Sequence, residues 1–167
     1  MRLPALGKLA AFTVPTALLI GCSGGSQNYD NPAQLIADAK DAGLECVDAR
    51  PDYAPEFASS DRYESVACGH AGDDPSSSYY DFPSVGMYVG PPNSELTPTF
   101  CEVVKERVNS GQDLSMTRGV STATAIVGTN WIIAEETNQS LSPAVDTQAV
   151  ADDTGGEVTT VAALCGI

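Results

Sequence analysis

Residues 120–134, with the sequence VSTATAIVGTNWIIA, indicate the fold class of this chain. Residues 120–127 are rich in Val, Thr and Ala, and residues 131–134 are apolar, so both segments are typical of β-strands. The Gly-Thr-Asn sequence at 128–130 is typical of a hairpin turn. We therefore expect two neighbouring antiparallel strands at this point of the chain.

Helices are expected both before and after this hairpin in the sequence. Asn31 is an N-cap residue, Pro32 stands at the first helical position, and Gln34 completes a capping box. This helix should end at Gly43, because glycine permits the left-handed conformation of a helix stop. The Thr-Pro pair at 97–98 repeats the same start and predicts a helix up to residues 109–111. A third helix is expected from residue 142 to about residue 153.

Further strands are expected at residues 44–47, 63–69, 85–89 and 157–161. Val85, Met87 and Val89 alternate with their neighbours at the two-residue period of a half-buried strand. Neighbouring strands joined by hairpins, with helices between the groups, favour an α+β fold. We expect two layers: a mainly antiparallel sheet of about four to five strands, covered on one face by two to three helices.

The N-terminal residues 1–21 have the composition of a secretory signal peptide. Arg2 and Lys8 give a positive start, and the apolar run at residues 9–20 is too short for a spanning helix, which needs about 20 residues. The run ends with Leu-Ile-Gly-Cys at 19–22, which resembles the lipobox of bacterial lipoproteins. This resemblance implies cleavage before Cys22, lipidation of its thiol by a diacylglycerol and acylation of the new amino terminus. The alternative is a plain secreted protein in which Cys22 is incidental.

The chain after the signal divides into a tether at residues 22–30 and one globular domain at residues 31–167. Without Arg2 and Lys8, 6 of the 8 basic residues remain against 22 acidic ones, a formal charge of −16. Nucleic acids and anionic lipids attract clusters of Lys and Arg, and a chain this acidic lacks them. We therefore expect no nucleic acid partner and no electrostatic docking on anionic lipid. The membrane contact is then made through the lipid on Cys22.

Four cysteines remain in the domain: Cys46, Cys68, Cys101 and Cys165. An even number in an oxidising compartment predicts disulfides, and four cysteines allow three pairings. We favour Cys46 with Cys68, because the short strands that carry them are expected to be neighbours, and Cys101 with Cys165 by elimination. A zinc site or a redox pair is the alternative, but no two cysteines have the C-x-x-C spacing.

The chain also resembles small, largely uncharacterised lipoproteins of actinobacteria. The shared features are the lipobox, a helix that ends in Gly43-Leu44-Glu45-Cys46, a second cysteine at Cys68, and the late sequence Gly128-Thr129-Asn130-Trp131. The resemblance implies a location in the envelope and a fold, and it implies no catalytic residue.

Other candidate sites have weaker motifs, and we predict neither a catalytic nor a metal site. His70 is the one histidine, and a Ser-His-Asp hydrolase would have to use it, but no G-x-S-x-G sequence is present. Two acidic groups lack the ligand order of a calcium loop. Four aromatic residues either form a binding surface or, as we favour, alternate ones among them cover the sheet core. These groups are Asp73, Asp74 and Asp81; Asp152, Asp153 and Glu157; and Tyr79, Tyr80, Phe82 and Tyr88.

We therefore expect a domain anchored by lipid to the extracytoplasmic face of the cell membrane, without a cofactor. The absence of an acid/base motif favours a protein that binds another envelope protein over an enzyme. Two alternatives stay open: a binder of small ligands or metal ions, and a hydrolase that uses His70.

Overall fold

The computed structural model describes residues 27–46, 49–50, 62–69, 85–110, 122–135 and 146–167. The expected strand at 44–47 is not formed at residues 44–46, and residue 47 lies outside the described part. The other expected helices and strands appear, with ends shifted by a few residues or lying outside the described part.

The described strands form one antiparallel sheet in the order β1-β2-β3-β5-β4-β6. Five strands have four or five residues, in agreement with the expected number, and the two-residue β1 is added at one edge. The strands are β1 (Ala49–Arg50), β2 (Glu64–Cys68), β3 (Val85–Val89), β4 (Thr124–Val127), β5 (Trp131–Glu135) and β6 (Glu157–Thr160). The predicted α+β class with a mainly antiparallel sheet is confirmed.

The predicted hairpin joins β4 and β5. Its register places Ala125 opposite Ala134 and Ile126 opposite Ile133. The Gly128 N–H donates to the Trp131 carbonyl across the turn, with 3.0 Å between N and O. β5 is the central strand of this arrangement, since β3 pairs with its other edge.

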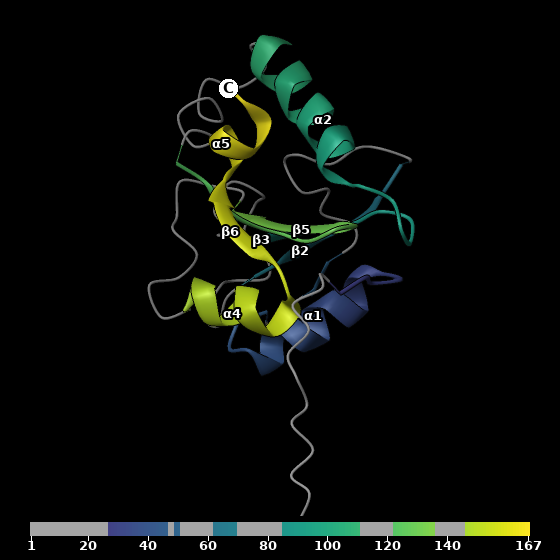
Figure 1. Cartoon of the computed structure of the whole chain (residues 1–167), viewed down its shortest axis with the longest axis vertical. Helices are drawn as coiled ribbons and strands as arrows, with labels where there is room; N and C mark the ends of the chain where they lie inside the picture. Colours follow the sequence, from purple (N-terminus) through teal and green to yellow (C-terminus); the bar gives the residue numbers. More distant parts are fainter. Residues whose placement is uncertain (1–26, 47–48, 51–61, 70–84, 111–121, 136–145) are drawn as a thin grey trace, which may run out of the picture.

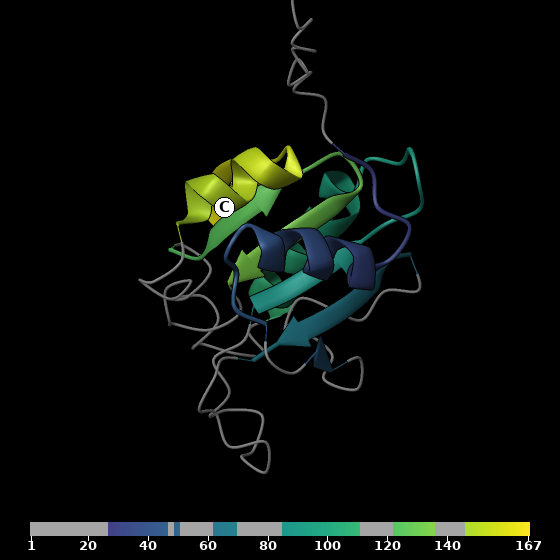
Figure 2. The same cartoon turned by 90° about the horizontal axis from the view of Figure 1, so that it is seen from below.

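The described helices cover both faces of the sheet. In Figure 1, α2 and α5 lie above the sheet and α1 and α4 lie below it; Figure 2 shows α1 and α4 in front of the strands. The helices are α1 (Pro32–Asp41), α2 (Thr97–Ser110), α4 (Thr147–Thr154) and α5 (Val161–Cys165).

This arrangement corrects the expectation of two layers with helices on one face. All five residues of β5 are buried, and so are all five of β3. Consecutive apolar residues, as at 131–134, indicate a strand that is covered on both sides, whereas alternation indicates one solvated face. The helices therefore divide into two layers, and each closes its own core.

The core below the sheet contains Leu35 of α1, Val150 of α4, and Met87, Ile126 and Trp131 of the strands. The core above the sheet contains, among others, Phe100 and Val104 of α2, Val161 of α5, and Tyr88 and Ile132 of the strands. Neighbouring strand residues thus point into opposite cores.

The helix ends follow their sequence signals. The Asn31 side chain accepts from the Gln34 N–H at 3.2 Å, as predicted for the N-cap. The Gln34 side chain accepts from the Asp30 N–H at 3.0 Å, so the second bond of the predicted capping box goes to the residue before the N-cap. Gly43 has a positive φ of 99°, and the Leu44 N–H donates to the Ala39 carbonyl, which ends the helix as predicted.

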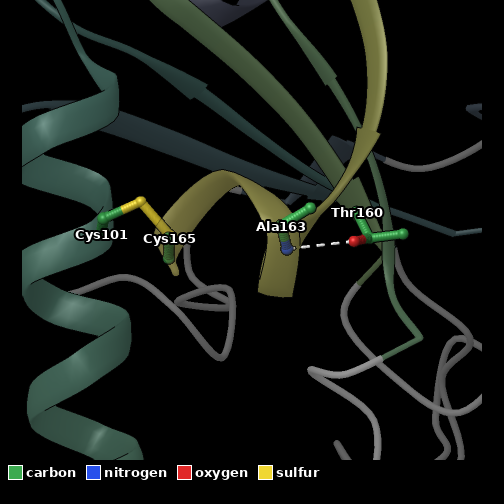
Figure 3. The surroundings of a disulfide bond; sticks show 4 residues. All are labelled: Cys101, Thr160, Ala163 and Cys165. Atoms are coloured by element: carbon green, nitrogen blue, oxygen red, sulfur yellow. Dashed lines mark hydrogen bonds between the residues drawn. A yellow bond between two sulfur atoms is a disulfide. The ribbon is translucent and has the colours of Figure 1, made fainter. Parts of the chain in front are cut away.

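Helix α5 was not predicted. The expected final strand ends at Thr160, whose hydroxyl caps the new helix by accepting from the Ala163 N–H at 3.1 Å (Figure 3). The short helix carries Cys165 to the second turn of α2, where it is bonded to Cys101 with the Cα atoms 5.1 Å apart (Figure 3).

The other favoured disulfide is also present. Cys46 and Cys68 are bonded, with 4.9 Å between their Cα atoms, in the core below the sheet. Each core is thus closed by one disulfide. The favoured Cys101–Cys165 bond fastens α5, the helix that the sequence did not predict, to α2.

Candidate functional site

A network of buried hydrogen bonds lies around Trp131, at the start of β5. The indole is fully buried, and two glycines leave room for it. A Cβ atom on Gly128 would lie 2.1 Å from the indole, and one on Gly156 would lie 2.6 Å from it. The hairpin turn and the start of β6 therefore need glycine because the ring lies directly against their backbone.

Asn130 is fully buried beside this ring and binds two distant segments of the chain. Its Oδ1 accepts from the Tyr29 N–H at 3.1 Å, and its Nδ2 donates to the Tyr29 carbonyl at 2.7 Å and to the Gly90 carbonyl at 3.0 Å. The Asn130 carbonyl accepts from the Gly90 N–H at 2.7 Å. Both ends of the amide are satisfied, as burial of such a group requires.

Residues 27–30 are held by further contacts on the same side. The Trp131 Nε1–H donates to the Gln27 carbonyl at 2.8 Å, and the Tyr29 ring packs edge-on against the indole with 5.7 Å between centroids. The Tyr29 hydroxyl donates to Asp38 of α1 at 3.0 Å. Burial, and then the hydrogen bond and charge of Asp38, raise the pKa of Tyr29 well above its ordinary value.

These contacts correct the predicted length of the tether. The expected flexible segment included residues 22–30, but Tyr29 is 2% exposed and belongs to the core. We call the hydrogen bonds of Gln27 and Tyr29 to Asn130, Trp131 and Asp38 the clamp. We call the region around the clamp the tether corner: residues 27–33 and the turn at 128–130.

An open groove of about 520 Å³ lies at the tether corner. It runs between the first turn of α1 and the beginning of β2, and its surface is mostly apolar. Its lining residues are Asn31, Pro32, Ala33, Glu64, Ser65 and Val66. The groove is on the α1 side of the sheet, because Val66 pairs with Met87 of the lower core.

Beside this groove, β2 has an open edge within the described part of the chain. β1 pairs only with Ala67 and Cys68, so residues 64–66 have a described strand neighbour on one side only, namely β3. An open strand edge carries backbone N–H and C=O groups that can pair with another strand. No local pattern in the sequence indicates this site, because it joins the first turn of α1 to β2, about thirty positions further along the chain.

The layer of α1 and α4 is acidic, whereas that of α2 and α5 is balanced. On or next to α1 and α4, Lys40 is accompanied by seven acidic residues: Asp30, Asp38, Asp41, Asp146, Asp152, Asp153 and Glu157. On α2, Glu102 and Glu106 stand beside Lys105 and Arg107, and Glu102 pairs with Arg62 at 2.8 Å.

A second buried polar group, Glu135, ends β5 and is 5% exposed. Its Oε2 accepts from the Thr124 N–H at 2.6 Å, while its Oε1 has no hydrogen-bond partner among the described residues. Burial raises the pKa of Glu135, and the bond from Thr124 opposes that rise. No sequence pattern indicates this group, because a charged residue at a strand end is usually solvated.

The candidate residues from the sequence fall into three groups. His70, the acidic residues at 73, 74 and 81, the aromatic residues at 79, 80 and 82, and Cys22 lie outside the described residues. Tyr88 is a core residue, as we favoured, and Trp131 is one too. In the described ranges no three His, Cys, Asp or Glu side chains gather as metal ligands would, so Asp152, Asp153 and Glu157 form no such group.

Comparison with protein-family models, with curated proteins and with solved structures gives no match to this chain. None of the helices in the described ranges has the length and apolarity needed to cross a membrane.

Proposed function

We propose that this protein is a binding protein of the bacterial envelope, anchored by lipid on Cys22 to the extracytoplasmic face of the membrane. Its binding site is the groove at the tether corner, and its ligand is an extended segment of another envelope protein. The observation that carries this proposal is the position of an apolar groove beside residues 64–66 of β2, which have no strand neighbour on that side among the described residues.

The shape of the groove supports an extended peptide as the ligand. A partner strand that pairs with residues 64–66 would bury alternate side chains against Pro32, Ala33 and Val66, since strand residues point alternately to the two faces. Backbone pairing then provides the affinity and the apolar lining provides the selectivity, as in other cases of strand addition.

Photo-cross-linking in intact cells tests this function. A photoreactive amino acid at Glu64, which is exposed at the groove, should give an adduct with one envelope protein. The Ala33→Trp substitution fills the groove from the exposed first turn of α1 and should abolish that adduct. The matched control is the same probe at Ala163, which is exposed on α5 in the opposite layer. Equal adducts from Glu64 and Ala163, or an adduct that survives Ala33→Trp, would contradict the proposal.

The anchor is tested separately. Replacement of Cys22 by Ala should release the protein from the membrane fraction into the medium, and mass spectrometry of the native N-terminal peptide should find a lipid on Cys22. Retention of the Cys22→Ala protein in the membrane would contradict the anchor without affecting the groove.

A further inference from the structure

The clamp determines how many residues separate the domain from Cys22. Gln27 is the first residue of the described chain, and its carbonyl is bonded to Trp131. Five residue steps lead from Cys22 to Gln27, and a fully extended chain covers at most about 3.6 Å per residue, hence about 18 Å. Without the clamp, nine steps would lead to Asn31 and reach about 32 Å.

The domain is larger than this reach. A strand of five residues is about 17 Å long, and helix layers on both sides of a sheet add about 10 Å each. The tether corner and α5 lie at opposite ends of the strands and on opposite faces, since α5 follows the far end of β6. Ala163 is therefore about 25 Å from the tether corner, which exceeds the extended length of the tether.

We propose that the clamp orients the domain on the membrane, with the tether corner toward the bilayer and the α2–α5 layer away from it. This inference rests on the proposed function, because it takes Cys22 as the point of attachment. It deepens that function, since the groove lines the same corner: its partner is then an extended segment that lies near the membrane surface, such as the juxtamembrane segment of a membrane protein.

Charge does not produce this orientation. The α1–α4 layer is the acidic one, so an anionic bilayer repels the face that the clamp turns toward it. The orientation is mechanical: four of the contacts that hold residues 27–29 are hydrogen bonds to the buried or half-buried side chains of Asn130, Trp131 and Asp38. It should therefore persist at high salt, where surface electrostatics is screened.

The experiment attaches the chain from Cys22 onward to vesicles by a maleimide lipid. Cys22 is the one cysteine outside the two disulfides, so the coupling is specific. A fluorophore is placed through an azido amino acid at Ala33 in the tether corner or at Ala163 on α5, both of which are exposed. Nitroxide lipids at the vesicle surface should quench the label at Ala33 several-fold more than the label at Ala163.

A flexible insertion provides the matched variant. Twenty Gly and Ser residues between Ser26 and Gln27 raise the root-mean-square reach from about 12 Å to about 25–30 Å, so the two labels should become equally quenched. The same twenty residues added after Ile167 should leave the difference unchanged. Equal quenching with the native tether would overturn the inference, as would a difference that survives the long tether. Because the lipid is attached chemically, neither result depends on lipidation in the cell.

Discussion

Removal of the Asn130 side chain should destabilise the domain strongly. Asn130→Ala leaves three buried backbone groups without their partner: the N–H and carbonyl of Tyr29 and the carbonyl of Gly90. An unpaired buried polar group costs about 1–3 kcal/mol. Residues 27–30 can partly detach and become hydrated, so we expect a loss of about 3–5 kcal/mol in the free energy of unfolding rather than the full sum.

The assay is chemical and thermal unfolding followed by circular dichroism and by the fluorescence of Trp131, the one tryptophan. A loss of this size is a large part of a typical stability of about 5–15 kcal/mol and should lower the Tm by about 10–20 °C. Asn109→Ala is the matched control, because Asn109 is exposed on α2 and should change stability by no more than about 0.5 kcal/mol. A loss below about 1 kcal/mol for Asn130→Ala would refute the importance of the clamp.

The Asn130→Asp substitution separates the donor from the acceptor. It keeps an oxygen for the Tyr29 N–H but places a carboxylate oxygen against the carbonyls of Tyr29 and Gly90. Burial should raise the pKa of this carboxyl, so its folded form binds a proton more readily than the unfolded form. The variant should therefore lose stability as pH rises and regain part of it in acid, a pH dependence that Asn130→Ala should lack.

Three further predictions follow from other contacts. Glu135→Gln should stabilise the domain at neutral pH. Because burial raises the pKa of Glu135, ionisation of this carboxyl lowers the free energy of unfolding as pH rises, and Gln does not ionise. The difference from the native protein should vanish below about pH 4.5, the ordinary pKa of Glu. Gly128→Ala should cost at least about 1–3 kcal/mol and shift the Trp131 emission, since its Cβ overlaps the ring. Replacement of both Cys101 and Cys165 by Ser should cost roughly 4 kcal/mol, judged from the 64-residue separation, and unfolding without reductant should show it.

Most of the fold could be predicted because its signals are local. The capping box at Asn31, the stop at Gly43 and the turn before Trp131 are each set by a few neighbouring residues. The number of layers could not be predicted in this way. Alternation at 85–89 was interpreted as one solvated face, but Gly86 and Tyr88 pack under the second helix layer, which only the tertiary structure supplies.

The site was predictable only in part, because its contacts join residues far apart in the chain. Asn130 and Tyr29 are 101 positions apart, and no single-sequence pattern announces a bond over that distance. The structure gives the sequence Gly128-Thr129-Asn130-Trp131 a role in packing: the glycine makes room for the indole, and the asparagine binds the N-terminal segment. The groove left no signal in the sequence, because its two walls come from α1 and β2.

In the orientation that we propose, one turn links stability to position on the membrane. The turn at 128–130 closes the central hairpin, binds the end of β3 through Gly90, and fixes the segment that leads to Cys22. A change outside the clamp, such as a longer tether, should alter the orientation and leave the unfolding free energy unchanged. A change within the clamp, such as Asn130→Ala, should weaken the orientation and also lower the free energy of unfolding, because the clamp that fixes residues 27–29 is also part of the packing around Trp131. Orientation and stability measured on these two variants thus distinguish a tether held by the domain from one that is merely attached to it.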